Sequence, residues 1–264
     1  MTRPREPILN LPPAVTAILA TLVLAHAALA LAPDDAATFI ESRLAFIPAR
    51  LALIVAPDAT LRHIAELSAP DADLGALAAY LNDATGVWWT PLSYVLLHAN
   101  APHLFINSLT LAAFGAPLAR RWSGLRFLGF FCATAVAGAL AFFAVHPFDL
   151  APVVGASGAI SGVMAGVTRF AFAPGGVLAE GGLSRRRPEG ASTPAQSLRD
   201  LLGNRRAMTF LILWFALNLL FGAFPAAAGA GSESIAWEAH VGGFLAGLLL
   251  FPLFDPARPR GEAA

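Results

Sequence analysis

The chain has 264 residues, of which 57% are hydrophobic and 13% are charged. Soluble domains carry about 25% charged residues, so the composition excludes an ordinary soluble domain and indicates a polytopic membrane protein. Seventeen basic residues, all of them arginine, balance 17 acidic residues, and this zero net charge gives no sign of a nucleic-acid partner. The single cysteine, Cys132, lies in an apolar run, so it excludes an internal disulfide and is typical of an inert buried side chain.

The first apolar segment covers residues 13–32 and follows a polar stretch, residues 1–12, which we expect to be a cytoplasmic N-terminus. The segment is long enough to span the ~30 Å hydrocarbon core of a bilayer. A basic start and an Ala-Leu-Ala sequence before Pro33 also fit a cleaved signal peptide. The run is longer than the roughly 7–15 residues of a signal-peptide core, so we favour a retained first helix.

Two long loops are predicted. Residues 33–92 are mixed and acidic, which predicts a long outer loop with short amphipathic helices. Trp88 and Trp89 near its end suit either an interfacial anchor or ordinary packing. Residues 173–206, rich in Gly, Pro and Arg, predict a mobile inner loop, and residues 255–264 predict a cytoplasmic tail.

The sequence therefore predicts an all-α polytopic membrane protein with one six-helix domain at residues 13–254. Arginine placement puts both termini inside, because inner loops are enriched in basic residues. The exceptions are Arg43, Arg50 and Arg62 in the long outer loop. The five apolar segments that complete the domain are 101–119, 125–145, 153–172, 207–224 and 236–254.

In this topology the second, fourth and sixth helices all begin at the outer face. His98, His103 and Asn107 lie just before and within the start of the second helix. Ser157 lies near the start of the fourth helix and His240 near the start of the sixth. At a rise of 1.5 Å per residue, a side chain four or five positions into a helix is roughly 6–8 Å deep. The coincidence in depth indicates a single polar site near the outer surface.

A serine and a histidine could carry the chemistry of this site. A serine hydroxyl is a weak nucleophile until a base removes its proton, and an imidazole suits that task at neutral pH. Glycines recur every four residues from Gly158 onward, and Gly243 and Gly247 follow His240 at the same spacing. Two such stripes facing each other let helix backbones approach closely. This predicts a hydrogen bond between Ser157 and His240.

An acyl-transfer site also needs hydrogen-bond donors for the developing oxyanion. The backbone N–H of Ser157 and the side chains of Asn107 and His98 are candidates. No carboxylate is clearly placed to orient His240, since Glu238 lies on another face of the same helix.

Each of these features also has a structural explanation. A Gly-x-Ser-Gly sequence in a membrane helix more often serves packing, a histidine at a helix end is often interfacial, and Asn107 suits an interhelical hydrogen bond. His98 and His103 could bind a metal, but their five-residue spacing fits one helical face poorly, and we expect no metal site. Composition and topology alone support catalysis and these structural roles equally.

Three motifs together resemble the rhomboid family of intramembrane serine proteases. Residues 98–107, HANAPHLFIN, resemble the family's H-x4-H-x3-N on the second helix. Residues 155–158, GASG, resemble the G-x-S-G of the fourth helix, and residues 239–247, AHVGGFLAG, resemble the A-H-x-x-G-x-x-x-G of the sixth. The resemblance covers roughly residues 86–254. One motif would be a weak signal, but three in this order are specific.

The resemblance implies that Ser157 is the nucleophile and His240 the general base. It implies an oxyanion site formed by Asn107, His98 and the Ser157 N–H, with His103 helping to hold the site together. It implies no cofactor and no metal. The glycines it implies as packing positions near the site are Gly155, Gly158, Gly243 and Gly247.

The resemblance also implies the partners. The family cleaves single-pass membrane proteins within or near their transmembrane segment, so the expected partners are such substrates and the lipid bilayer. Substrates should enter sideways, and helix-destabilising sequences should be preferred, because a helical backbone hides its carbonyl groups.

The sequence departs from the family pattern in two places. Some bacterial members carry a tyrosine four residues after the nucleophile, stacked on the histidine, and Ser161 occupies that position here. His240 must then be supported otherwise, by Trp237 or by a hydrogen bond. Ala119 stands where an acidic residue often precedes a basic pair, which concerns stability more than chemistry.

Two other functions compete with proteolysis. A non-catalytic rhomboid-like protein could bind transmembrane helices for membrane quality control, but it would not need Ser157, His240 and Asn107 together. A transporter would usually show internal repeats, and the sequence has none. The arginine- and alanine-rich composition suggests a bacterium with GC-rich DNA, and hence a protein of the inner membrane. The topology predicted from arginine placement puts the active site toward the outer face of that membrane.

Overall fold

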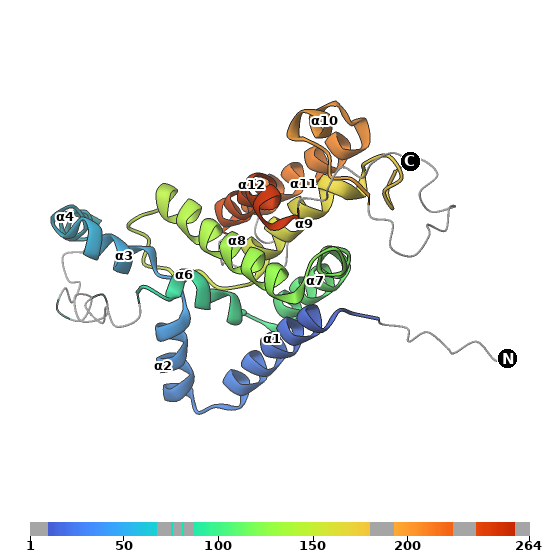
Figure 1. Ribbon diagram of the computed structural model, residues 1–264. Helices are drawn as coiled ribbons and strands as arrows, with labels where there is room; N and C mark the ends of the chain where they lie inside the picture. The colour runs from blue at the N-terminus through green and yellow to red at the C-terminus, as the bar shows by residue number, and fades with distance from the viewer. Residues whose placement is uncertain are drawn as a thin grey trace.

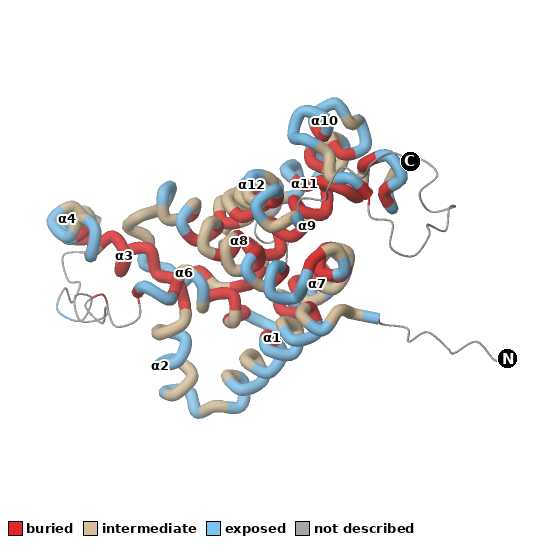
Figure 2. The backbone as a smooth tube through the Cα atoms, in the orientation of Figure 1, coloured by how far each residue is buried: buried red, intermediate tan, exposed pale blue. Residues whose placement is uncertain are grey.

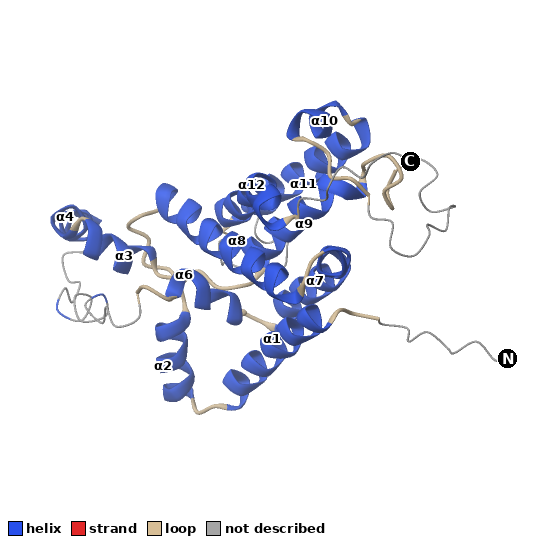
Figure 3. Ribbon diagram, in the orientation of Figure 1, coloured by secondary structure: helices blue, strands red, loops and turns tan. Residues whose placement is uncertain are grey.

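The computed structural model describes residues 10–67, 75, 81, 87–179, 193–223 and 236–256. Within these residues the chain is all-helical, as predicted (Figure 3). Its strand-like pairing is an isolated bridge between Phe46 and Val153. A helix lies in each of the six predicted apolar segments. These helices are α1 (Pro13–Leu31), α7 (Ala101–Arg121), α8 (Gly124–Val145), α9 (Ser157–Ala171), α11 (Arg205–Ala223) and α12 (Trp237–Phe254).

Helix α9 lies at the centre of the bundle, in contact with α7, α8 and α12 (Figure 1). Nearly every residue from Gly158 to Ala171 is buried (Figure 2). The many glycines and alanines of α9 let the neighbouring helices approach closely. The helix begins four residues later than the predicted segment 153–172, because Val153 pairs with Phe46 in extended conformation and Gly155 has a positive φ of 115°.

Three of the described helices, α1, α8 and α12, are long and apolar enough to cross a membrane. Together with the composition of the chain, they mark the protein as membrane-embedded. Helix α9 has 15 residues, fewer than the roughly 20 of a typical span. Six spans therefore remain a prediction.

Short helices occupy the described part of the predicted outer loop. They are α2 (Asp34–Leu44), α3 (Pro48–Val55), α4 (Pro57–Leu67), α6 (Thr90–Ser93) and the 3-10 turn η1 (Tyr94–Leu96). In Figure 1, α3 and α4 extend away from the bundle. Residues 68–74, 76–80 and 82–86 of the loop lie outside the described residues.

Backbone hydrogen bonds attach this loop to the connection between α8 and α9. Phe46 and Val153 exchange two bonds of 3.2 and 2.8 Å, and the Ala49 N–H donates to the Asp149 carbonyl at 3.0 Å. Trp88 and Trp89 are both exposed, and the indole N–H of Trp89 donates to the Arg43 carbonyl at 3.0 Å. The loop thus borders the segment that leads into the start of α9.

Glycine contacts join α9 to α12. A Cβ atom on Gly243 would overlap the carbonyl oxygen of Gly158, and a Cβ on Gly247 would overlap that of Gly162. On its other side, α9 meets α8, where the Thr134 side chain fills the space beside Gly162. These contacts hold the N-terminal parts of α9 and α12 at a close and fixed separation.

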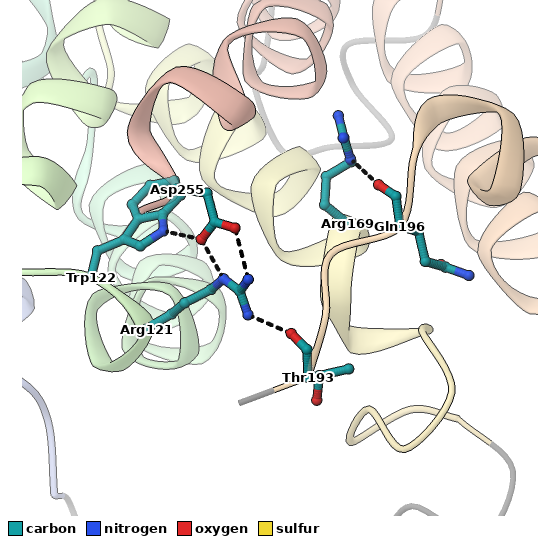
Figure 4. A network of polar contacts seen from close by, with 6 residues as sticks. All are labelled: Arg121, Trp122, Arg169, Thr193, Gln196 and Asp255. Carbon is teal, nitrogen blue, oxygen red and sulfur yellow. Dashed lines mark hydrogen bonds and ion pairs between the residues drawn. The ribbon is translucent and has the colours of Figure 1, made fainter. Parts of the chain in front are cut away.

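A polar network joins the C-terminal ends of α7 and α12 (Figure 4). The Arg121 guanidinium binds both carboxylate oxygens of Asp255, at 2.7 and 2.8 Å, and the indole N–H of Trp122 donates to Asp255 at 2.8 Å. Arg121 also donates to the Thr193 carbonyl at 2.7 Å, and Arg169 donates to the Gln196 carbonyl at 2.9 Å.

Part of the predicted inner loop is helical. Its described part contains α10 (Leu198–Gly203), which begins with a capping box between Ser197 and Asp200. The hydroxyl and backbone hydrogen bonds from Ser197 lower the pKa of the Asp200 carboxyl. This helix and the contacts of Thr193 and Gln196 lie within the inner loop predicted at residues 173–206, whose mobility stays a prediction. Residues 180–192 lie outside the described part.

Candidate active site

Ser157 is the first residue of α9, and its position follows from the turn before it. Gly155 adopts a φ of 115°, a conformation that residues with a Cβ atom rarely adopt. The Gly155 N–H donates to the Tyr94 carbonyl at 3.0 Å, which fixes this turn against η1. The chain therefore turns sharply into α9 and leaves the Ser157 side chain half-buried at the start of the helix.

His240 lies in the first turn of α12 and reaches across to α9. Its Nε2 atom is 2.7 Å from the Oγ atom of Ser157, a normal hydrogen-bond distance. The glycine contact between Gly158 and Gly243 brings the two helices close enough for this bond. The structure thus brings together the serine and the histidine that the sequence singled out.

Asn218 on α11 is a polar neighbour of His240 that the sequence interpretation missed. Its Oδ1 atom lies 2.7 Å from Nδ1 of His240, and its Nδ2 atom donates to the Trp214 carbonyl at 2.8 Å. An available signal was the presence of an asparagine in an apolar segment, because such residues need polar partners inside a membrane. Asn218 also lies about one and a half turns from the end of the segment predicted at 207–224, which implies a depth similar to that of Ser157.

His103 lies on the other side of the serine turn. A Cβ atom added to Gly155 would be 2.8 Å from Cε1 and Nε2 of His103 and 3.8 Å from Oγ of Ser157. The His103 ring therefore packs directly against the backbone that positions the serine. The Asn100 side chain caps the start of α7 by accepting from the His103 N–H at 2.8 Å.

His98 precedes α7 and packs edge-on against His103, with ring centroids 5.1 Å apart. Burial lowers the pKa of its imidazole to about 4, and the nearby His103 and His26 add to this effect. Both ring nitrogens are buried and make no hydrogen bond of normal geometry with the described residues. A polar contact with the Leu96 backbone raises the pKa and so opposes part of the effect of burial. A neutral His98 keeps one N–H available as a donor.

Asn107 follows His103 by one helical turn on α7 and is buried, with 4% of its surface exposed. Its side chain makes no hydrogen bond to Ser157 or His240 in this structure. A buried amide carries two N–H donors that need partners. It remains a candidate donor to a group bound at the serine.

The start of α9 supplies further donors. The first N–H groups of a helix have no carbonyl within the helix to bind, and no side chain caps this one at Ala156. They carry the partial positive charge of the helix N-terminus. This partial charge would stabilise a negative oxygen that forms next to Ser157.

Two other residues considered from the sequence have different contacts. Glu238 pairs with His146 at the end of α8, at 2.7 Å, so its carboxylate is engaged away from His240. Trp237 packs against Gly222 of α11, where an added Cβ would lie 2.5 Å from the indole ring. Of the two supports considered for His240, the structure supplies a hydrogen bond. Within the described residues, no group of three or more His, Cys, Asp or Glu side chains could hold a metal ion.

Comparison with known proteins identifies the family. GluP, a rhomboid protease of Bacillus subtilis (strain 168), is 37% identical over 81 residues, which are 31% of this chain and 15% of GluP. YdcA, another Bacillus subtilis protein named for rhomboid proteases, is 36% identical over 83 residues, which are 31% of this chain and 41% of YdcA. The chain thus aligns with less than half the length of either relative.

The family model of the rhomboid domain matches residues 85–174 and 191–255, which together make up more than half of the sequence. The match includes α7, α8, α9, α11 and α12, and therefore every residue of the site described above. The chain belongs to the rhomboid family.

Proposed function

We propose that the protein is an intramembrane serine endopeptidase in which Ser157 is the nucleophile and His240 the general base. The observation that supports this most directly is the 2.7 Å contact between Ser157 Oγ and His240 Nε2. A nucleophile within hydrogen-bond reach of its base is the geometric requirement for this chemistry. Membership of the rhomboid family and two relatives named for proteases support the same role.

In the proposed reaction, His240 Nε2 takes the proton of the Ser157 hydroxyl as Oγ attacks the carbonyl carbon of the scissile peptide bond. The protonated histidine then gives this proton to the leaving amide nitrogen, which leaves an acyl group on Ser157. A water molecule activated by His240 hydrolyses the acyl group and restores the serine. The proposed mechanism uses side chains, backbone groups and water.

The proposed oxyanion site combines the N–H groups at the start of α9 with side chains from the region of α7. The Ser157 N–H, Asn107 and a neutral His98 would donate to the tetrahedral oxygen. His103 would hold this side of the site in place through its contact with Gly155. Removing one such donor typically lowers kcat by a factor of about 10²–10³.

We further propose that α1, α7, α8, α9, α11 and α12 all span the membrane as one domain, residues 13–254. The short α9 is compatible with this role because protein, rather than lipid, covers nearly all of it. Fourteen of the 17 arginines then lie on the inner side or at inner helix ends, which favours cytoplasmic termini. The loop at residues 33–92 is then outside and that at residues 173–206 inside.

This orientation places Ser157 and His240 near the outer face of what we propose is a bacterial inner membrane. The proposed substrates are single-pass membrane proteins, cut within or near the transmembrane segment. Since backbone carbonyl groups in a helix are already hydrogen-bonded, a segment that unwinds easily should be cut faster.

The test is cleavage of a model single-pass substrate by the detergent-solubilised protein, with Ser157→Ala and His240→Ala as variants. Each should lower kcat/KM by several powers of ten. Ser161→Ala is the matched control, because Ser161 is buried one turn further along α9 and its hydroxyl makes no hydrogen bond to His240. Cleavage by either dyad variant at the wild-type rate would refute the assignment.

A fluorophosphonate probe, which reacts with activated serines, separates a poor substrate from an inert site. Labelling of the wild type but not of Ser157→Ala would support the nucleophile even where the chosen substrate is not cut. Absence of both labelling and cleavage in a folded wild-type protein would refute the protease proposal and favour a non-catalytic role.

A further inference from the structure

Both ring nitrogens of His240 have a side-chain partner, and the two partners come from different helices. Nε2 contacts Ser157 Oγ on α9, and Nδ1 contacts Asn218 Oδ1 on α11, each at 2.7 Å. A histidine that acts as a base for serine must present an unprotonated Nε2 and carry its proton on Nδ1. The group next to Nδ1 therefore determines whether His240 is ready to act.

The contacts of Asn218 fix which end of its amide faces His240. Its NH2 group donates to the Trp214 carbonyl at 2.8 Å, and only the nitrogen of an amide can donate to a carbonyl. The oxygen Oδ1 must then be the atom beside His240 Nδ1. Since Oδ1 is an acceptor only, Nδ1 carries the proton, and the lone pair of Nε2 points toward the Ser157 hydroxyl.

Packing between α11 and α12 holds Asn218 at this height. Trp214, one turn before Asn218, stacks on Phe244, one turn after His240, with ring centroids 4.2 Å apart and an interplanar angle of 27°. Trp214 is buried and Phe244 is fully buried. The stacked pair thus fixes both the carbonyl that orients Asn218 and the helix that carries His240.

We propose that Asn218 is a positioning residue of the proposed protease reaction, acting through His240. It selects the productive tautomer, fixes the plane of the ring, and stabilises the positive charge that forms when Nε2 takes the Ser157 proton. The Nδ1–H stays on the ring throughout, and its bond to Oδ1 strengthens as the ring becomes charged. This inference rests on the proposed function of Ser157 and His240.

Helix packing alone would not require this arrangement. An asparagine in an apolar helix can satisfy itself by donating to a carbonyl one turn earlier, as Asn218 does to Trp214. That bond does not by itself require a partner for Oδ1, yet Oδ1 lies at hydrogen-bond distance from Nδ1 of His240. The carboxylate nearest in sequence, Glu238, is bound to His146 instead. Asn218 therefore takes the place that an acidic residue fills in many serine hydrolases.

The experiment compares Asn218→Leu and Asn218→Asp with the wild type in detergent, measuring kcat and KM on a model substrate and the rate of fluorophosphonate labelling against pH. Leucine has a similar size but accepts no hydrogen bond, so kcat and the labelling rate should fall about ten- to hundredfold, with KM nearly unchanged. Aspartate keeps an acceptor and stabilises the protonated ring. Because the base must be neutral, the acid limb of the rate profile should move to higher pH in Asn218→Asp.

Thr209→Ala is the matched control on α11, because its hydroxyl is exposed and bonds within its own helix, to the Arg205 carbonyl. It should leave the rates and the pH profile unchanged. Wild-type rates in a folded Asn218→Leu protein would overturn the inference. If that variant does not fold, an acid limb in Asn218→Asp identical to that of the wild type would overturn it equally.

The same measurement separates this inference from the proposed function. If the wild type is labelled and the Asn218 variants are labelled at the same rate, the role of Asn218 is refuted and the proposed function is not. A folded wild type that is neither labelled at Ser157 nor active removes the proposed function and, with it, this inference.

Discussion

Gly243 on α12 packs against the backbone carbonyl of Gly158 on α9, so closely that a Cβ atom on Gly243 would overlap the oxygen. Gly158 directly follows Ser157, and Gly243 lies about one turn after His240. The hydrogen bond between the two side chains therefore depends on how near the two backbones can come. A single added methyl group should be enough to change that distance.

We expect Gly243→Ala to separate α9 from α12 and to weaken the bond between Ser157 and His240. Overpacking of this kind typically costs about 1–3 kcal/mol, and the neighbouring atom here is backbone, which cannot move aside as a side chain can. The thermal midpoint in detergent and the fluorophosphonate labelling rate should both fall. Gly203→Ala is the control at an exposed position, because among the described residues no atom from outside its own helical turn lies within 4 Å of the added Cβ. A Gly243→Ala protein with wild-type midpoint and labelling would contradict the importance of this contact.

A second prediction concerns the turn before Ser157. Gly155→Ala must place a Cβ atom at a φ of 115° and 2.8 Å from the His103 ring. Strained backbone conformations of this kind cost about 1–3 kcal/mol. We expect the labelling rate of Ser157 to fall at least tenfold, because the turn that sets the serine position must shift.

The double variant Gly155→Ala/His103→Ala separates two causes of this loss. Removing the ring relieves the steric overlap but leaves the unfavourable φ, so the thermal midpoint should recover only in part. Full recovery would show that the clash with His103 is the whole effect. No recovery would mean that backbone strain alone accounts for the loss.

The sequence was informative about depth along each helix. Counting residues from the ends of the apolar segments predicted Ser157 and His240 at one level, and the structure brings their side chains to 2.7 Å. The glycine spacing also indicated which helices would pack closely. These properties follow from helix rise and residue size, which are local.

The rotation of α11 about its own axis depends on contacts with other helices, and for this reason the role of Asn218 was missed. Its helix has apolar side chains on most of its surface, so no amphipathic pattern indicates which face meets α12. The stacking of Trp214 on Phe244 decides this rotation, and it needs both helices to be in place. The segment before Ser157 shows the same limit, since hydropathy at Val153 does not distinguish a helix from the extended pairing with Phe46.

The last prediction concerns the C-terminal ends of α7 and α12, where Asp255 binds Arg121 and Trp122 (Figure 4). Asp255→Ala leaves the Arg121 guanidinium, whose side chain is only 8% exposed, without its carboxylate. We therefore expect the free energy of unfolding to fall by about 3 kcal/mol. This is the lower end of the range for a buried ion pair, because the Asp255 side chain is 16% exposed. The thermal midpoint in detergent should fall clearly, while labelling of the folded protein at low temperature should stay near wild type, since the network is remote from Ser157. Asp35→Ala, at an exposed position on α2, is the control and should change the midpoint little. An unchanged midpoint in Asp255→Ala would show that the Thr193 carbonyl and the rings of Phe170 and Phe251 hold Arg121 without the carboxylate.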